Sequence, residues 1–376
     1  MRLVLAALSL FLLLPLMAGP ANARMVTDLA GREVNVPDHV DKVLLGEGRF
    51  LPALGILEPE DPVALLSGMM ADLELLDPAT YHQYADAFPA LTRLPTIGRS
   101  TTETFSVEKA ISLAPDVAIF GISGGHGPSE KSARVIETLQ DAGVAVVFID
   151  FRQDPIVNTP KSIALLGEIL GREKRAAAFN AFYAAQLDIV ESRLADVKER
   201  PTVFLESRVG LHDQCCETMG EGMLGRFIGL AGGDNIAIGL VPGVVGTVSI
   251  EHLLQVQPEH YVATGIGSSW GDPVKGRVIL GTGATMEMAQ RSLAEAMERP
   301  GLAELDAVRE GHVHAIWHHF YNSPFNVVAL QEMAKWFHPD LFADLDPRHR
   351  LAEAYRRFQP VPLEGAFWAS LPEEAQ

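Results

Sequence analysis

Three arginines stand on segments where a parallel sheet would place a binding site. Arg49 and Arg208 follow the apolar runs 43–45 and 202–205, and Arg99 precedes the first copy of an internal repeat. Arginine is always charged, and its planar donors match carboxylate, catecholate or hydroxamate oxygens. Any one of them could be a surface or ion-paired arginine. Together, in a chain whose net charge is −18, they predict an anionic ligand that at least two of them contact.

Aromatic side chains follow other strand-like runs. Trp317 and Tyr321 come after the run 313–316, and Trp270 ends the glycine-rich stretch 265–271. They could form flat apolar walls for an aromatic ligand, or they could equally belong to the core. Haem also stays open, because its iron could take Tyr321, His318 or His319 as an axial ligand.

The densest group among the 12 histidines invites a metal interpretation. On a strand His312 and His314 would share one face, whereas His318 and His319 would point apart. The remaining histidines complete no matching ligand set, so we predict no metal site formed by protein side chains alone. Zinc or manganese binding remains a lesser alternative.

Cys215 and Cys216 are adjacent, and no third cysteine exists to form a long-range bridge. In an oxidising compartment they could form a vicinal disulfide beside the binding loops, which is the interpretation we favour. Two free thiols or a soft-metal site are the alternatives.

The elements that must position these residues alternate along the chain. Short β-branched runs predict strands at 43–45, 117–120, 144–149, 202–205, 262–264 and 313–316. Helical patterns lie between them, for example at 130–142, 173–197 and 285–298. This alternation predicts an α/β fold with parallel sheets and helical crossovers.

The middle of the chain, 156–198, carries no strand signal. Asn158 followed by Thr159 and Pro160 predicts a helix start, and Gly171 predicts its end. A longer helical pattern follows at once. The chain therefore divides into two α/β regions joined by helix rather than by a flexible linker.

An internal repeat relates the two α/β regions. Residues 106–119 (SVEKAISLAPDVAI) and 249–262 (SIEHLLQVQPEHYV) align at a constant offset and share a Ser-x-Glu start, with Glu108 and Glu251 in equivalent places. Any helix-turn-strand unit in an α/β sheet would look similar. The shared start and the shared Pro-acid stop nevertheless favour duplication.

The N-terminus has the pattern of a secretory signal peptide. Arg2 precedes the apolar run 3–17, and Ala21-Asn22-Ala23 supplies a small-x-small cleavage site. The run is shorter than the roughly 20 residues that span a bilayer, which disfavours a membrane anchor. We predict cleavage near Ala23 and export to the periplasm.

Composition and missing motifs exclude several classes of function. The acidic balance and the lack of basic runs argue against nucleic-acid binding. The chain contains no Walker loop or HExxH motif, so an enzyme is not predicted. A secreted hydrolase is the distant alternative.

Several motifs in order resemble the periplasmic binding proteins that serve ABC importers of ferric siderophores, haem and cobalamin. The motifs are TDLAGREVNVP at 27–37, the two Glu-bearing repeats, GEILG at 167–171, AGGDNIA at 231–237 and Asn322-Ser323-Pro324. The resemblance implies two Rossmann-like lobes, a rigid connecting helix and a ligand cleft between the lobes. The domains would be a signal peptide (1–23), an N-terminal lobe (24–153), the helix (154–172), a C-terminal lobe (173–345) and an extension (346–376).

The resemblance also implies partners. Glu108 and Glu251 would dock onto arginines of the permease dimer, which works with a cytoplasmic ATPase. Each glutamate could instead simply favour the dipole of its helix, and the two roles are compatible. We expect a monomer without an intrinsic cofactor that binds a ferric siderophore, with haem, cobalamin or bare zinc or manganese as alternatives. The expected ligand-binding residues are Arg49, Arg99, Arg208, Cys215, Cys216, Trp270, Trp317, His318 and Tyr321.

Overall fold

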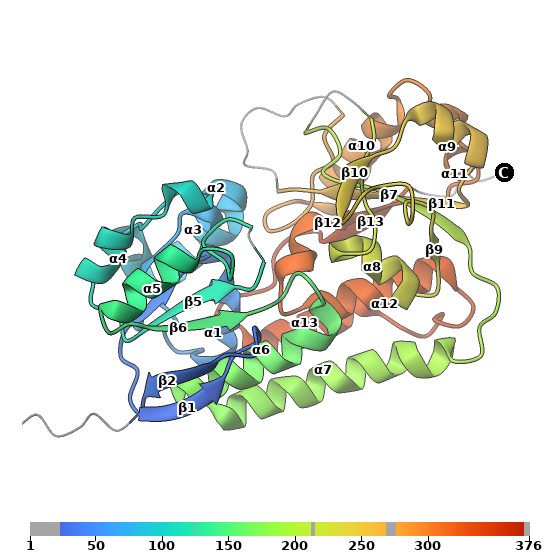
Figure 1. The fold of residues 1–376 in the computed structure, drawn as a ribbon. Coiled ribbons are helices and arrows are strands. Elements are labelled where there is room, and N and C mark those ends of the chain that lie inside the picture. Colours follow the sequence, from blue (N-terminus) through green and yellow to red (C-terminus); the bar gives the residue numbers. More distant parts are fainter. Residues whose placement is uncertain (1–22, 124, 212–214, 268–275, 372–376) are drawn as a thin grey trace, which may run out of the picture.

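The computed structural model describes residues 23–123, 125–211, 215–267 and 276–371. Trp270 and the predicted signal peptide, apart from Ala23, therefore lie outside the described residues. Two separate sheets, each covered by helices, form two lobes that stand side by side above a layer of long helices (Figure 1). The predicted α/β fold with two lobes is confirmed.

The first lobe is built on a four-stranded, wholly parallel sheet in the order β4-β3-β5-β6. An antiparallel hairpin of β1 (Ala23–Thr27) and β2 (Glu33–Pro37) precedes it. The sheet strands are β3 (Val43–Leu45), β4 (Leu66–Met69), β5 (Val117–Gly121) and β6 (Ala145–Ile149). The helices are η1 (Gly48–Phe50), α1 (Leu51–Leu57), α2 (Asp72–Leu76), α3 (Pro78–Ala87), η2 (Pro89–Arg93), η3 (Thr102–Thr104), α4 (Val107–Ser112) and α5 (Ala133–Asp141).

The second lobe has a mixed sheet whose centre is parallel. Its order is β10-β8-β7-β11-β12-β13, with β9 also paired to β7. The strands are β7 (Thr202–Glu206), β8 (Glu217–Met219), β9 (Asp234–Asn235), β10 (Val245–Thr247), β11 (His260–Gly265), β12 (Val313–Trp317) and β13 (Trp368–Ser370). The helices are α8 (Met223–Leu230), α9 (Ile250–Val256), α10 (Met286–Met297), η4 (Leu302–Glu304), α11 (Asp306–Arg309), η5 (His318–Asn322), α12 (Asn326–Phe337) and α13 (Pro347–Phe358).

All six predicted strands form, because each is a short run of apolar residues buried between covering helices. The sequence missed β4, whose apolar run is interrupted by Ser67 and Gly68. It also missed the short strands β8, β9, β10 and β13, which flank the parallel centre of the second sheet. Each has only two or three residues, and none of them is wholly apolar.

Two long helices, α6 (Pro155–Leu170) and α7 (Glu173–Leu194), pack together and join the lobes (Figure 1). The predicted helix start at Asn158 is wrong, because α6 begins at Pro155 and includes Pro160. Proline has no N–H to bond the carbonyl of Ile156, and the Tyr183 hydroxyl of α7 lies 3.4 Å from that oxygen instead. The predicted end is correct: Gly171 has φ 65°, which glycine tolerates without strain.

The C-terminal segment ties both lobes together. Strand β13 pairs with β12 of the second sheet, and α13 packs against α1 of the first lobe. The Gln359 amide, at the end of α13, donates to the carbonyl of Pro52 at 2.9 Å. None of the helices in the described ranges is long and apolar enough to cross a membrane.

The two copies of the internal repeat adopt the same local structure. Ser106 caps α4 by accepting from the Lys109 N–H, and Ser249 caps α9 by accepting from the His252 N–H. Each helix then leads into a central strand, β5 or β11. The equivalent sequence signals thus produce equivalent caps, as the repeat predicts.

Candidate functional site

A buried cluster of charges forms where the strands of the first sheet end. Glu47 and Arg49 follow β3, Asp72 begins α2 after β4, and Arg152 follows β6. The Arg49 Nε donates to Asp72 Oδ2 at 3.3 Å, and the Arg152 Nη2 donates to Glu47 Oε2 at 2.9 Å. The Gly48 N–H also donates to Asp72, at 2.6 Å. The first lobe therefore holds both guanidinium groups in place with its own carboxylates.

The second lobe reaches this cluster through η5. The Arg49 Nη1 donates to the Tyr321 hydroxyl at 3.0 Å, and the Asn322 amide donates to Glu47 at 3.3 Å. The guanidinium carbons of Arg49 and Arg152 lie 5.6 and 5.3 Å from the centre of the Tyr321 ring. These contacts bridge the lobes at the carboxyl ends of their strands, the place that the parallel sheets predict for ligand binding.

Burial and opposite charges set the protonation states of the cluster. Burial would raise the pKa of Glu47, but Arg152 and Arg49 outweigh it and lower that pKa. Burial raises the pKa of Asp72 to about 6 despite the neighbouring Arg49. Burial also opposes ionisation of Tyr321, yet Arg49 and Arg152 lower its pKa below the usual 10. The two arginines thus make the phenol of Tyr321 easier to ionise than a free phenol.

A pocket of about 540 Å³, open solvent included, lies between the lobes beside this bridge. Its polar wall comprises His126, Arg152, Ser207, Arg208, Glu217, His318 and Tyr321. Its apolar wall comprises Met219, Met223 and Val245. Because the lining comes from both lobes, a ligand held here would contact both of them.

Each group on the polar wall is held by a neighbour. Arg208 forms an ion pair with Glu217. Its Nη2 donates to both carboxylate oxygens, Oε1 at 2.6 Å and Oε2 at 2.8 Å. His318 Nδ1 lies 3.0 Å from the Thr264 hydroxyl. His126 Nδ1 lies 3.0 Å from the Ser100 carbonyl, which can only accept, so this nitrogen carries the proton and Nε2 keeps its lone pair.

Both histidines are neutral at neutral pH. Burial, helped by Arg49, lowers the pKa of His126 to about 3. Burial, helped by His319 and Arg208, lowers the pKa of His318 well below its ordinary value. A neutral imidazole can donate a lone pair to a metal, so this wall offers nitrogen and phenol ligands beside arginines.

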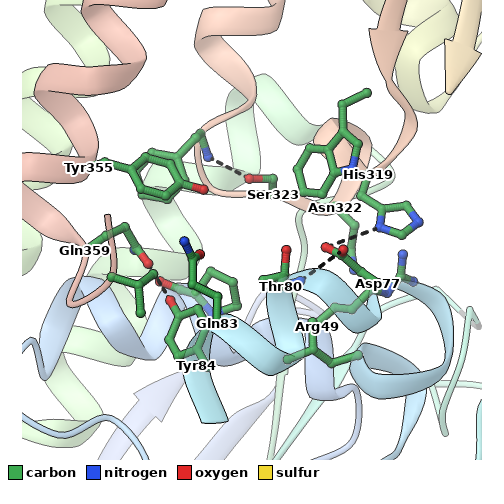
Figure 2. Close-up of a pocket in the computed structure, with 15 residues that line it drawn as sticks. Arg49, Asp77, Thr80, Gln83, Tyr84, His319, Asn322, Ser323, Tyr355 and Gln359 are labelled. Carbon is green, nitrogen blue, oxygen red and sulfur yellow. Dashed lines mark hydrogen bonds and ion pairs between the residues drawn. The ribbon is translucent and has the colours of Figure 1, made fainter. Parts of the chain in front are cut away.

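A second, more enclosed pocket of about 490 Å³ is shown in Figure 2. Arg49 lines this pocket and Tyr321 lines the first one, so the Arg49–Tyr321 bridge lies between them. Side chains of α3, η5 and α13 surround the second pocket. Asp77 Oδ2 and His319 Nδ1 are 3.9 Å apart across the two lobes, and Tyr84 bonds Gln359 at the opposite end. The bridge therefore divides the space between the lobes into two chambers.

Some of the predicted site residues line the two pockets, and others lie outside them. Arg208, His318 and Tyr321 line the first pocket, Trp317 lines the second, and Arg49 stands at the bridge. Arg99 lies outside the lining of both pockets, and its N–H donates to Thr104 Oγ1.

The adjacent cysteines form a disulfide. The buried Cys216 exchanges backbone hydrogen bonds with Val248, so it belongs to the strand layer. Neither Cys215 nor Cys216 lines the two pockets.

Glu47, Asp72 and Arg152 belong to the buried cluster of charges, although they are not among the residues predicted from the sequence. Glu47 and Arg152 follow β3 and β6, so the rule that selected Arg49 could have found both. Asp72 follows β4, which was not predicted, and no comparable signal marked it.

The comparisons with known proteins agree with this geometry. Residues 77–317 match the sequence family described as "Periplasmic binding protein". No curated protein sequence matches the chain. Two lobes, a helical connection and an interlobe pocket define a solute-binding protein, and the family match places this chain among the periplasmic binding proteins of ABC importers.

Solved structures share the fold at low sequence identity. The TroA-like periplasmic binding protein FepB from Veillonella parvula gives a TM-score of 0.82 at 24% identity, covering 92% of this chain and 99% of its own. The molybdate-binding MolA from Haemophilus influenzae gives 0.67 at 18% identity, covering 91% and 99%. A periplasmic heme-binding protein from Pseudomonas aeruginosa gives 0.53 at 19% identity, covering 80% and 94%.

Proposed function

We propose that this protein captures a ferric siderophore in the periplasm and delivers it to the permease of an ABC importer. The observation that carries the proposal is the polar wall of the interlobe pocket. It places Arg152 and Arg208 beside the Tyr321 phenol and two neutral histidines. Guanidinium groups suit the oxygens of a chelate, and the phenol and imidazoles suit an open coordination position on iron.

The charge balance of the pocket bears on the kind of chelate. Arg49, Arg152 and Arg208 are paired with Asp72, Glu47 and Glu217, so their positive charge is largely offset. A guanidinium has five N–H donors, and one paired with a carboxylate can still donate to a ligand oxygen. The arrangement favours a chelate of modest negative charge over a strongly anionic one.

Haem is the second candidate, and the same Tyr321 favours it. A phenolate can serve as an axial ligand of haem iron, and Arg49 and Arg152 lower the pKa of this phenol. The apolar wall of Met219, Met223 and Val245 would suit a porphyrin face. The two candidates differ in the absorption that they would add to the protein.

Delivery would use the two equivalent glutamates. Glu108 on α4 and Glu251 on α9 are exposed in the first turns of the repeated helices, one on each lobe. We place the lobes at 24–153 and 173–345 around the helix 154–172, with 346–376 as the extension. The exported chain would begin after Ala23 and act as a monomer.

The test is quenching of tryptophan fluorescence in the purified protein. The titrants are ferric catecholate, hydroxamate and carboxylate siderophores, with haem, cobalamin and zinc as controls. Saturation below micromolar concentration by one siderophore class alone supports the proposal. Saturation by haem alone, with a new Soret band, replaces the siderophore with haem. Binding of none of the titrants overturns both candidates.

A further inference from the structure

An exposed apolar strip continues the apolar wall of the pocket onto the surface. Four large apolar side chains stay exposed within residues 238–245: Ile238 (49%), Leu240 (49%), Val244 (46%) and Val245 (43%). Exposed apolar side chains are ordinary when scattered, but a contiguous group marks a surface that binds something. We call these four residues the apolar strip.

Val245, Val244 and Ile238 connect the strip to the pocket. Val245 lines the pocket, and in the sheet it stands opposite Met219, which lines the same wall. The Val244 side chain lies over Gly222, where an added Cβ would come within 2.7 Å of it, and Gly222 adjoins Met223 of the wall. Ile238 and Val244 then line a neighbouring hollow that shares this edge.

The loop that carries the strip is held in a defined conformation. The Asn235 amide donates to the carbonyls of Met219 and Gly220, and Asn235 Oδ1 accepts from the Ala237 N–H. Val241 is 9% exposed and anchors the loop, while its neighbours point outward. The strip is therefore a preorganised surface, and a ligand would not have to order it on binding.

We infer that the ligand is amphiphilic, with a chelating head among Arg152, Arg208 and Tyr321 and an aliphatic chain along the apolar strip. This inference rests on the proposed function and adds the substrate class: an acylated ferric chelate. The polar and apolar walls face one pocket, and the apolar wall leads through Val245 to the exposed strip. Each methylene buried along the strip would tighten binding by roughly fourfold.

The test compares two ferric bis-catecholates that differ only in an acetyl or an octanoyl cap. We expect the octanoyl chelate to bind at least about tenfold more tightly, as measured by tryptophan quenching below its aggregation concentration. The double variant Ile238→Ser/Val244→Ser should lose most of that difference. Leu341→Ser, which changes an apolar residue of similar exposure (44%) outside the strip, should keep it.

The outcomes separate the inference from the proposed function. If both chelates bind the unaltered protein equally, the inference is wrong and the receptor function stands. The strip would then be a contact for the permease or for a second copy of the chain. If neither binds, and the siderophore panel is also negative, the proposed function and the inference fail together. An octanoyl preference that survives the double variant also overturns the role of the strip.

Discussion

Arg49 of the first lobe donates to the hydroxyl of Tyr321 of the second lobe at 3.0 Å, and both side chains are buried. The bond connects the two lobes where β3 and β12 end. It also gives one phenol an environment unlike that of the other tyrosines, because Arg152 lies over the same ring. Tyr321 also lines the interlobe pocket.

Tyr321 should ionise before any other tyrosine. Burial raises the pKa of Tyr81, Tyr84, Tyr183, Tyr261 and Tyr355, whereas the two arginines lower that of Tyr321. Titration followed by phenolate absorbance should show one group that ionises below pH 10. Tyr321→Phe should remove that step.

Tyr355→Phe is the matched control for this titration, because its phenol is buried and has a raised pKa. The early step should persist in this variant. An unchanged early step in Tyr321→Phe would show that the arginines do not stabilise the phenolate. The same Tyr321→Phe protein, loaded with a ferric ligand, should lose any phenolate-to-iron absorption band.

Arg208→Ala should weaken binding of a ferric chelate by about 1–3 kcal/mol, since charge-assisted hydrogen bonds have that magnitude. Its side chain is one-third exposed (33%), so its loss should change the unfolding free energy by less than about 1 kcal/mol. Arg49→Ala is a poorer test, because it leaves Asp72 buried without its arginine and should cost about 3 kcal/mol of stability.

Calorimetric titration with the chelate identified by the siderophore panel measures the effect of Arg208→Ala. The control is Arg309→Ala, which removes an exposed arginine paired with Asp306 away from both pockets. Equal affinity in Arg208→Ala and the unaltered protein would remove Arg208 from the proposed site.

Reversing the charge at Glu108 and Glu251 should block delivery but not capture. Both side chains are exposed, and both helices keep their serine caps, so the fold should persist. We expect Glu108→Lys/Glu251→Lys to bind ligand normally and to stimulate the ATPase of the reconstituted importer at least about tenfold less, because like charges would meet at the interface.

Glu137→Lys, an exposed change on α5, is the control for the docking variant and should leave ATPase stimulation intact. If the double variant stimulates the importer normally, the two glutamates serve only their helices. If the double variant no longer binds ligand, the substitutions have disturbed the structure of the lobes, and the loss of stimulation says nothing about docking.

Acid should destabilise the protein through histidines at the far ends of β11 and β12. Burial, helped by His312, lowers the pKa of His260 to about 4, and burial lowers the pKa of His314 well below 6.5. The unfolded chain takes up these protons first, so stability is full above pH 6.5 and falls as the pH drops toward 4. His260 alone should account for about 2 kcal/mol at pH 5.

Denaturant unfolding of His260→Gln at pH 7.5 and pH 5 checks this prediction. The variant should lose less stability than the unaltered protein between the two values. Comparing the two proteins is essential, because the raised pKa of Asp72 acts in the opposite direction over part of the same range. Parallel losses in both proteins would contradict the role of His260.

Much of the fold could be predicted because its central strands are buried on both faces. A run such as 144–149 has to be apolar throughout, and that requirement is visible without any structure. Strand β4 escaped prediction because Gly68 interrupts its apolar run. A larger side chain at Gly68 would collide with the Leu113 side chain and the Pro95 carbonyl, and these neighbours are known only from the structure. The start of α6 was misplaced because Pro160 is compatible with either a first turn or a kinked interior.

The sequence by itself determined the two-lobed α/β plan, the equivalent capped helices that carry Glu108 and Glu251, and the segments from which binding residues come. These depend on local periodicity and on the end of each strand. Only the tertiary structure decided which charges meet. The partners of Arg49 come from the loop after β3, from α2 and from a segment 272 residues away, so its pairing with Tyr321 arises from the packing of the two lobes. Tertiary packing likewise placed Cys216 in the strand layer and Arg152 in the pocket, because packing sets which strand ends face each other.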